Sequence, residues 1–212
     1  MESQTIQSIA LMLGAGWASG LNLYAAMLVL GWMGASGQTD LPQSLEILSN
    51  PLVMGAAGLM FVVEFFADKM PGLDSLWDAV HTFIRIPAGA LLAAGAAQGL
   101  DMGTAGELAG LILGGGLATT SHVSKASTRA LINTSPEPVT NWSASITEDA
   151  AVIGGLWTAL NYPWLFVLLL ILFILLAAWL VPKIWRLLKA GGKTVFSWFR
   201  KPQSAEIANK TD

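Results

Sequence analysis

Cysteine is absent from this sequence of 212 residues, and charged residues make up only 12% of it. The lack of cysteine excludes disulfides, thiolate nucleophiles and cysteine-ligated zinc. Soluble globular proteins carry about 25% charged residues. A content of 54% hydrophobic residues and a mean hydropathy of +0.58 therefore predict a protein whose main partner is the lipid bilayer.

Basic residues are missing from the whole first third of the chain, where none precedes Lys69. A secretory signal peptide begins with a basic region, so we expect the first hydrophobic segment to be retained. Seven of the eleven Lys and Arg residues follow Pro182. With no basic surface rich in aromatic residues elsewhere, nucleic acid is not an expected partner.

Residues 3–39 and 150–182 contain no charged side chain at all. A membrane-spanning helix needs roughly 20 apolar residues, so both stretches are long enough to cross a bilayer. Apolar runs and the breakers between them predict an all-α, polytopic helical bundle. The six expected segments are 6–35, 51–68, 74–100, 105–132, 143–160 and 163–181. We expect a break in the first segment near Leu21 and Asn22, and a kink in the third at Pro87.

The distribution of Lys and Arg predicts the orientation of these six crossings. Basic residues gather in cytoplasmic loops, and Lys69, Arg85, Lys125 and Arg129 all fall on the side of the basic C-terminus. We therefore expect a membrane domain over residues 1–182. Residues 183–212 are expected to form a basic amphipathic cytoplasmic tail with a disordered end.

Two glycine-rich stretches occupy matching places in the first and fourth segments, at 14–16 and 114–116. They suggest an inverted repeat of three helices plus three, a pattern of many secondary transporters. Close helix packing also selects small residues, so a shared packing requirement explains the similarity equally well.

Charged residues gather at the cytoplasmic side of the predicted bundle. Asp74, Asp78, His81 and Arg85 are spaced to share one helix face. The topology brings further acids and bases to the same leaflet. The candidate residues for substrate or ion binding are Glu64, Asp68, Asp74, Asp78, His81, Arg85, His122, Lys125, Arg129, Glu148 and Asp149.

Three interpretations of these charges stay open: a site that handles a substrate or ion, a structural salt-bridge network, and the solvated face of an interfacial helix. A divalent-metal site around Asp78 and His81, with Glu64, Asp68 and His122, matches no established spacing, so metal binding is left undecided. No motif predicts a cofactor. An intramembrane enzyme would have only Ser121 or Ser124, beside His122, as its nucleophile.

Asn22 and Tyr24 interrupt an apolar stretch of the first segment. They predict either an interhelical hydrogen bond or an unwound patch on a transport path. The triplet Pro136, Glu137 and Pro138 is typical of a rigid loop.

Four parts of the sequence carry a family resemblance: residues 18–25, the run from Glu64 to Arg85, residues 87–90, and the spacing of His122, Lys125 and Arg129. In these parts the chain resembles a bacterial membrane family known as domain of unknown function 4126, and the resemblance covers residues 5 to about 182. It implies a multi-helix protein of the bacterial inner membrane and implies no activity.

These observations favour a small secondary transporter or permease-like protein with a charged cavity facing the cytoplasm. Glu64, Asp68, Asp78 and His81 would handle cations or protons, while Lys125 and Arg129 would neutralise them or bind an anionic group. Six helices are few to enclose a path, so a homo-oligomer is expected. The alternative is a scaffold or assembly factor that recruits partners through the charged rim and the basic tail.

Overall fold

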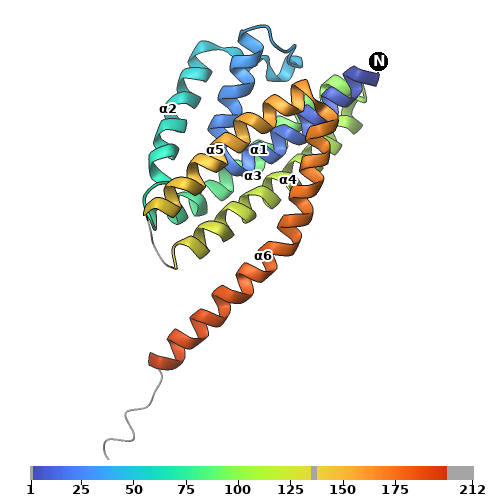
Figure 1. Cartoon of the computed structure of the whole chain (residues 1–212). Helices are drawn as coiled ribbons and strands as arrows, with labels where there is room; N and C mark the ends of the chain where they lie inside the picture. The colour runs from blue at the N-terminus through green and yellow to red at the C-terminus, as the bar shows by residue number, and fades with distance from the viewer. Residues whose placement is uncertain (1, 135–137, 200–212) are drawn as a thin grey trace, which may run out of the picture.

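The structure is a computed structural model, which describes the backbone of residues 2–134 and 138–199 and the side chains of residues 4–134 and 139–190. All regular secondary structure in these residues is helical, as predicted (Figure 1). The elements in chain order are α1 (Glu2–Ala35), η1 (Gln43–Ser49), α2 (Pro51–Ala67), α3 (Leu73–Ala97), η2 (Gln98–Leu100), α4 (Gly103–Ile132), α5 (Pro138–Asn161) and α6 (Pro163–Phe199).

α1 is the central helix of the bundle. It packs against α3, α4 and α5, and α3 packs most extensively against α4. α2 lies at one flank, while α6 runs along the opposite side of the bundle and continues beyond it (Figure 1). The core around α1 is built largely from Ala and Leu side chains.

Glycine allows α1, α3 and α4 to approach closely. A Cβ atom added at Gly16 would lie 2.6 Å from the Cα atom of Gly114, which is closer than real Cβ atoms come to backbone. At Gly20 an added Cβ would clash with the carbonyl oxygen of Ala118. The two glycine-rich stretches of the sequence therefore meet where α1 crosses α4, as expected where small residues let membrane helices pack closely.

Three helices among the described residues are long and apolar enough to cross a membrane, at Gln4–Ala35, Leu73–Leu100 and Pro163–Ala190. The bent pair η1 and α2, which meet at 67°, adds a fourth if it counts as one span. The predicted total of six crossings stays a prediction. α4 and α5 carry the polar side chains described below, which lower their mean hydropathy.

α6 presents an almost entirely apolar surface, and most of its apolar segment lies outside the interior of the bundle. Leu168, Leu172 and Leu175 are each more than half exposed. In water such a surface would be unstable, whereas in a bilayer it contacts lipid.

Several element boundaries differ from the expectations. The stretch between the first two segments is not simply a loop, because η1 forms there and buries Leu45 and Leu48. α5 begins at Pro138, five residues before the expected start at Ser143. α6 does not end near Val181 but continues through Pro182 to Phe199. Pro136 and Glu137, the side chain of Lys193 and all of residues 200–212 lie outside the described residues.

Candidate functional site

The predicted break in α1 is present and is centred on Asn22. This residue has non-helical torsion angles of φ −150° and ψ 99°, which divide α1 into two half-helices. The Asn22 side chain caps the second half-helix, since its Oδ1 atom accepts a hydrogen bond from the amide of Ala25 at 2.9 Å. Its Nδ2 atom donates to Asp149 Oδ1 at 2.9 Å.

The break also frees a main-chain carbonyl inside the bundle. The Leu21 carbonyl oxygen accepts a hydrogen bond from Lys125 Nζ at 3.0 Å. The C-terminal end of a helix carries partial negative charge, so a cation is favourable there. Both ends created by the break therefore bind ionisable side chains of other helices.

Around this break lies a set of seven side chains joined by ion pairs, here called the charge cluster: Glu64, Asp68, Asp78, Arg85, Lys125, Arg129 and Glu148. Helical spacing explains how each helix contributes. Lys125 and Arg129 are four residues apart on α4, Glu64 and Asp68 are four apart at the end of α2, and Asp78 and Arg85 are two turns apart on α3.

Arg85 joins α2 to α3. Its guanidinium donates to Glu64 Oε1 at 2.8 Å and to Asp78 Oδ1 at 2.7 Å. The Arg85 side chain is completely buried, and so is that of Glu64. A charge can be buried only when ion pairs at hydrogen-bond distance, such as these two, offset the cost of removing it from water.

Lys125 lies at the centre of the charge cluster. Its Nζ atom is 2.6 Å from Asp68 Oδ2 and 3.5 Å from Glu64 Oε1, with Glu148 Oε2 at 3.6 Å. Arg129 extends the cluster toward α5 by donating to Glu148 Oε2 at 2.7 Å and to the main-chain oxygen of Asp68 at 2.9 Å. One lysine and one arginine of α4 thus connect α2 with α5.

The charge cluster contains more acids than bases. Four carboxylates face three bases, and Lys69 with Asp149 nearby adds one charge of each sign. Glu64 Oε2, Asp68 Oδ1 and Asp78 Oδ2 are buried oxygen atoms without a hydrogen bond from the described part of the chain. A buried, unbalanced negative charge is costly, so this arrangement favours uptake of a proton or of one small cation.

The two histidines lie beside the charge cluster. His122 Nε2 is 2.7 Å from Thr82 Oγ1, and its Nδ1 is 3.5 Å from the Arg85 guanidinium. His81 Nε2 is 3.2 Å from the Tyr24 hydroxyl, and the ring stacks on Trp77. Tyr24 therefore makes the interhelical hydrogen bond that was one of its two predicted roles.

Most of the predicted site residues come together, and Asp74 is the exception. It lies at the start of α3, where it accepts hydrogen bonds from the amides of Gly72 and Ser75 and from the Asn133 side chain. These bonds fix the turn between α2 and α3. Asp74 is a structural residue rather than a member of the charge cluster.

Lys69 was missed by the sequence-based selection although it is buried beside the site. Its ammonium donates to the Phe65 carbonyl at 3.0 Å and to Ser145 Oγ at 3.3 Å, and it lies over the Phe65 ring. The pKa of Lys69 is lowered, chiefly because burial disfavours the charged form. Its position directly after Asp68 was the available signal. Nothing in the sequence marked Asn141 as a site residue. Its main-chain carbonyl accepts a hydrogen bond from the Arg129 guanidinium at 3.2 Å.

Burial excludes one of the three interpretations of the charged residues. The stripe formed by Asp74, Asp78, His81 and Arg85 is at most 4% exposed, so the solvated-face interpretation is wrong. The metal and enzyme alternatives gain no support from the geometry. Within the described ranges, no group of three or more His, Asp or Glu side chains could hold a metal ion. Ser121 and Ser124 donate to main-chain oxygens of Trp17 and Thr120 rather than to His122.

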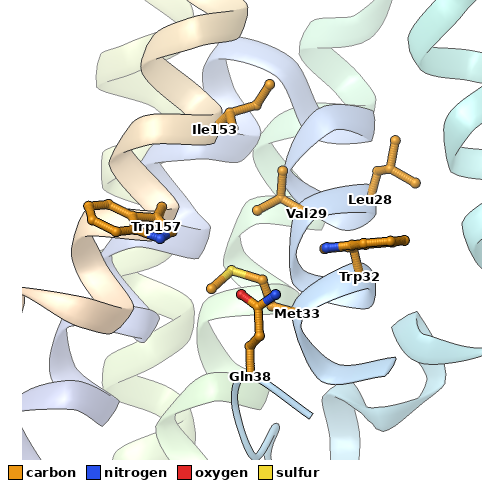
Figure 2. Close-up of a pocket in the computed structure, with 7 residues that line it drawn as sticks. All are labelled: Leu28, Val29, Trp32, Met33, Gln38, Ile153 and Trp157. Carbon is orange, nitrogen blue, oxygen red and sulfur yellow. The ribbon is translucent and has the colours of Figure 1, made fainter. Parts of the chain in front are cut away.

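Two cavities differ sharply in chemistry. One of about 380 Å³ lies between α1 and α5. Figure 2 shows the side chains that line it, among them Trp32 and Trp157 on opposite walls, and none of the seven is titratable. The second, of about 410 Å³, lies between α4, α5 and α6 and reaches Lys125 and Glu148. Only the second leads to the charge cluster.

Comparison with known proteins places the chain in a family without an assigned activity. No match was found among curated proteins or among solved structures. A family model, described as Domain of unknown function (DUF4126), matches residues 9–183, which include every residue of the charge cluster and the break in α1. The chain therefore belongs to the DUF4126 family.

Proposed function

We propose that this protein is a small secondary transporter or permease-like membrane protein in which the charge cluster binds and releases a proton as the coupling ion. The observation that carries the proposal is the break in α1 at Asn22, where the Leu21 carbonyl binds Lys125 and the capped start of the second half-helix binds Asp149. Discontinuous membrane helices build the substrate and ion sites of many transporters in this way.

The charge balance supports a proton as the ion. One carboxylate in excess of the bases gives the cluster a place for a proton, and Glu64, Asp68 and Asp78 each offer a buried oxygen atom to hold it. A purely structural network has no need for an unbalanced charge, because equal numbers of acids and bases would be more stable in a low dielectric.

The proposal extends to location and orientation. We place the protein in a bacterial inner membrane with its C-terminus in the cytoplasm, because Lys183, Arg186 and Lys189 follow the last apolar span. The charge cluster then lies in the cytoplasmic half of the bundle.

The test uses purified protein in liposomes that enclose a pH-sensitive dye. An inward proton gradient is imposed while a panel of small cations, amino acids, organic acids and sugars is added outside. We expect at least one solute to cause a change in internal pH with the natural protein and with Glu46→Gln, which alters an exposed acid of η1. Glu64→Gln should abolish the change. Lack of any solute-dependent proton movement across the panel would refute the proposal.

A second candidate function, a scaffold, is favoured by the long α6 helix, which projects beyond the bundle (Figure 1). Its extension past Pro182 begins with Lys183, Arg186 and Lys189. Removal of residues 183–212 separates the two functions. A transporter should retain solute-dependent proton movement, whereas a scaffold should lose its bound partners.

A further inference from the structure

The second cavity offers an open route to the charge cluster. It exists because α4 and α5 make few contacts with each other, whereas α4 packs closely on α3. Leu21, at the break in α1, lies at its inner end together with Lys125 and Glu148, and Phe173 of α6 forms part of its wall. This cavity is called the α4–α5 cleft below.

Two members of the charge cluster, Lys125 and Glu148, line this cleft, and Glu148 is the more exposed of the two. Its side chain keeps 14% of its surface exposed, whereas the exposed fraction of the other six does not exceed 2%. The ion pairs of Glu148 with Lys125 and Arg129 both use Oε2. Its second carboxylate oxygen, Oε1, takes part in neither ion pair and can accept hydrogen bonds from a ligand in the cleft.

Of the five hydroxyl groups in the lining, all but that of Thr140 have already donated their protons and can only accept hydrogen bonds. Ser124 donates to the Thr120 carbonyl at 2.8 Å, and Thr128 donates to the Ser124 carbonyl at 2.9 Å. On α5, Ser143 and Thr147 likewise donate to carbonyls one turn earlier, at 2.8 and 2.7 Å. A hydroxyl whose proton is engaged presents lone pairs to its surroundings.

Lys125 also lines the cleft, but its ammonium already donates to the Leu21 carbonyl, to Glu64 and to Asp68. The remaining side chains of the lining are apolar. Leu21, Ile132 and Ala144 contribute apolar side chains, and Phe173 contributes an aromatic ring. A volume of about 410 Å³ is far more than a bare metal ion needs and is within the range of sites for small organic molecules. The cleft thus combines a carboxylate, hydrogen-bond acceptors, an aromatic ring and apolar surface.

We propose that the α4–α5 cleft binds a small organic ammonium cation from solution, with its N–H groups on Glu148 and the hydroxyl oxygens and its hydrocarbon part against Leu21 and Phe173. Charge-assisted hydrogen bonds and the aromatic ring both favour a positively charged nitrogen. An anion would be repelled by Glu148 and would find, among the described residues of the lining, only the Thr140 hydroxyl as a free donor. This inference rests on the proposed function in one respect, since it names the substrate class of that same transporter.

Binding is measured by calorimetry on the full chain in phosphatidylcholine nanodiscs, without any gradient. The probes are n-butylammonium, tetramethylammonium, n-butanol, butyrate and sodium ion. We expect n-butylammonium to bind more tightly than tetramethylammonium, which has no N–H group, and the other three to show no binding. Binding of butanol as tight as that of butylammonium, or of butyrate at all, would overturn the proposal.

Two variants test the residues. Glu148→Gln should weaken butylammonium binding by about tenfold or more, since a hydrogen bond to a charged group is lost. Thr147→Val keeps the shape of the side chain and leaves the charge cluster intact. It should weaken butylammonium binding by a smaller factor of about three to ten. Glu46→Gln is the matched control and should bind as the natural protein does. Unchanged binding in Thr147→Val and Glu148→Gln, when both retain the natural helix content, would contradict the assignment.

The lipid is the other source of ammonium groups. If phosphatidylethanolamine in the nanodiscs abolishes butylammonium binding, the cleft holds a lipid head group and the proposal of a free solute is wrong. The failures of the two proposals are distinguishable. Butylammonium binding without proton movement contradicts the transporter alone, whereas proton movement with another solute and no ammonium binding contradicts only this inference.

Discussion

The ammonium nitrogen of Lys125 lies 3.0 Å from the main-chain oxygen of Leu21, the carbonyl that the break in α1 leaves without a helical partner. The same nitrogen lies 2.6 Å from Asp68 Oδ2. One buried lysine therefore binds both the carbonyl at the break in α1 and the carboxylate at the end of α2. This relation makes the conformation of α1 depend on the charge cluster.

Replacement of Lys125 with Met should destabilise the protein by about 3–5 kcal/mol, because the change leaves Asp68 and the Leu21 carbonyl buried without their cation. The free energy of unfolding is measured by denaturant titration in bicelles. Lys183→Met is the matched control. Lys183 is exposed on α6, so its removal should cost less than about 0.5 kcal/mol. Equal effects of the two substitutions would show that Lys125 is not a central contact.

Gly16→Ala should destabilise the bundle by about 1–3 kcal/mol or prevent folding, because the added methyl group would meet the backbone of Gly114 at 2.6 Å. The control is Gly116→Ala, where nothing lies within 4 Å of the added atom. That change should be neutral or stabilise α4 by up to about 1 kcal/mol, since Ala favours helix over Gly. Thermal unfolding in detergent compares the pair, and a similar midpoint for both would contradict the close approach of α1 and α4.

Asn22→Ala should cost about 1–2 kcal/mol for the lost cap, and it also removes the hydrogen bond to Asp149. Asn22→Ser restores a capping oxygen but not the donor to Asp149, so it should recover part of the loss. Amide hydrogen exchange at Leu23 and Ala25 reports the local effect. Exchange that is as slow in Asn22→Ala as in the natural protein would show that the half-helix does not depend on this cap.

Lys69 predicts a dependence of stability on pH. Its pKa is lower in the folded protein than the ordinary value of 10.5, because burial disfavours the ammonium form. Below the lowered pKa both the folded and the unfolded states are protonated, and the folded state carries the full penalty of burial. The penalty is lost as the pH rises from the lowered pKa toward 10.5, so the unfolding free energy increases in that window.

The measurement compares the natural protein with Lys69→Met in denaturant titrations between neutral pH and 10.5. The natural protein should gain stability relative to the variant as the pH rises. A constant difference across this range would show that Lys69 has the same pKa in both states.

The helices and several features of the site were predictable because their signals are local. The glycine-rich stretch with Asn22 predicted the break in α1, and the spacing of Asp78, His81 and Arg85 predicted that they share one face of their helix. Lys69 was missed because its burial depends on Ser145 of α5, which is 76 residues away in the sequence and which no local pattern places beside it. Asp74 was assigned to the cluster by its spacing, but hydrogen bonds to the turn and to Asn133 hold it elsewhere.

Composition alone determined that this chain is an α-helical protein suited to lipid, because long apolar runs with few charges can satisfy their backbone only as helices in a bilayer. Only the tertiary structure decided which acid meets which base. Lys125 and Asp68 are 57 residues apart in the sequence, and their contact depends on how α2 and α4 pack around α1. The burial of these charges and the cleft that reaches Glu148 also arise from packing, which no local pattern encodes.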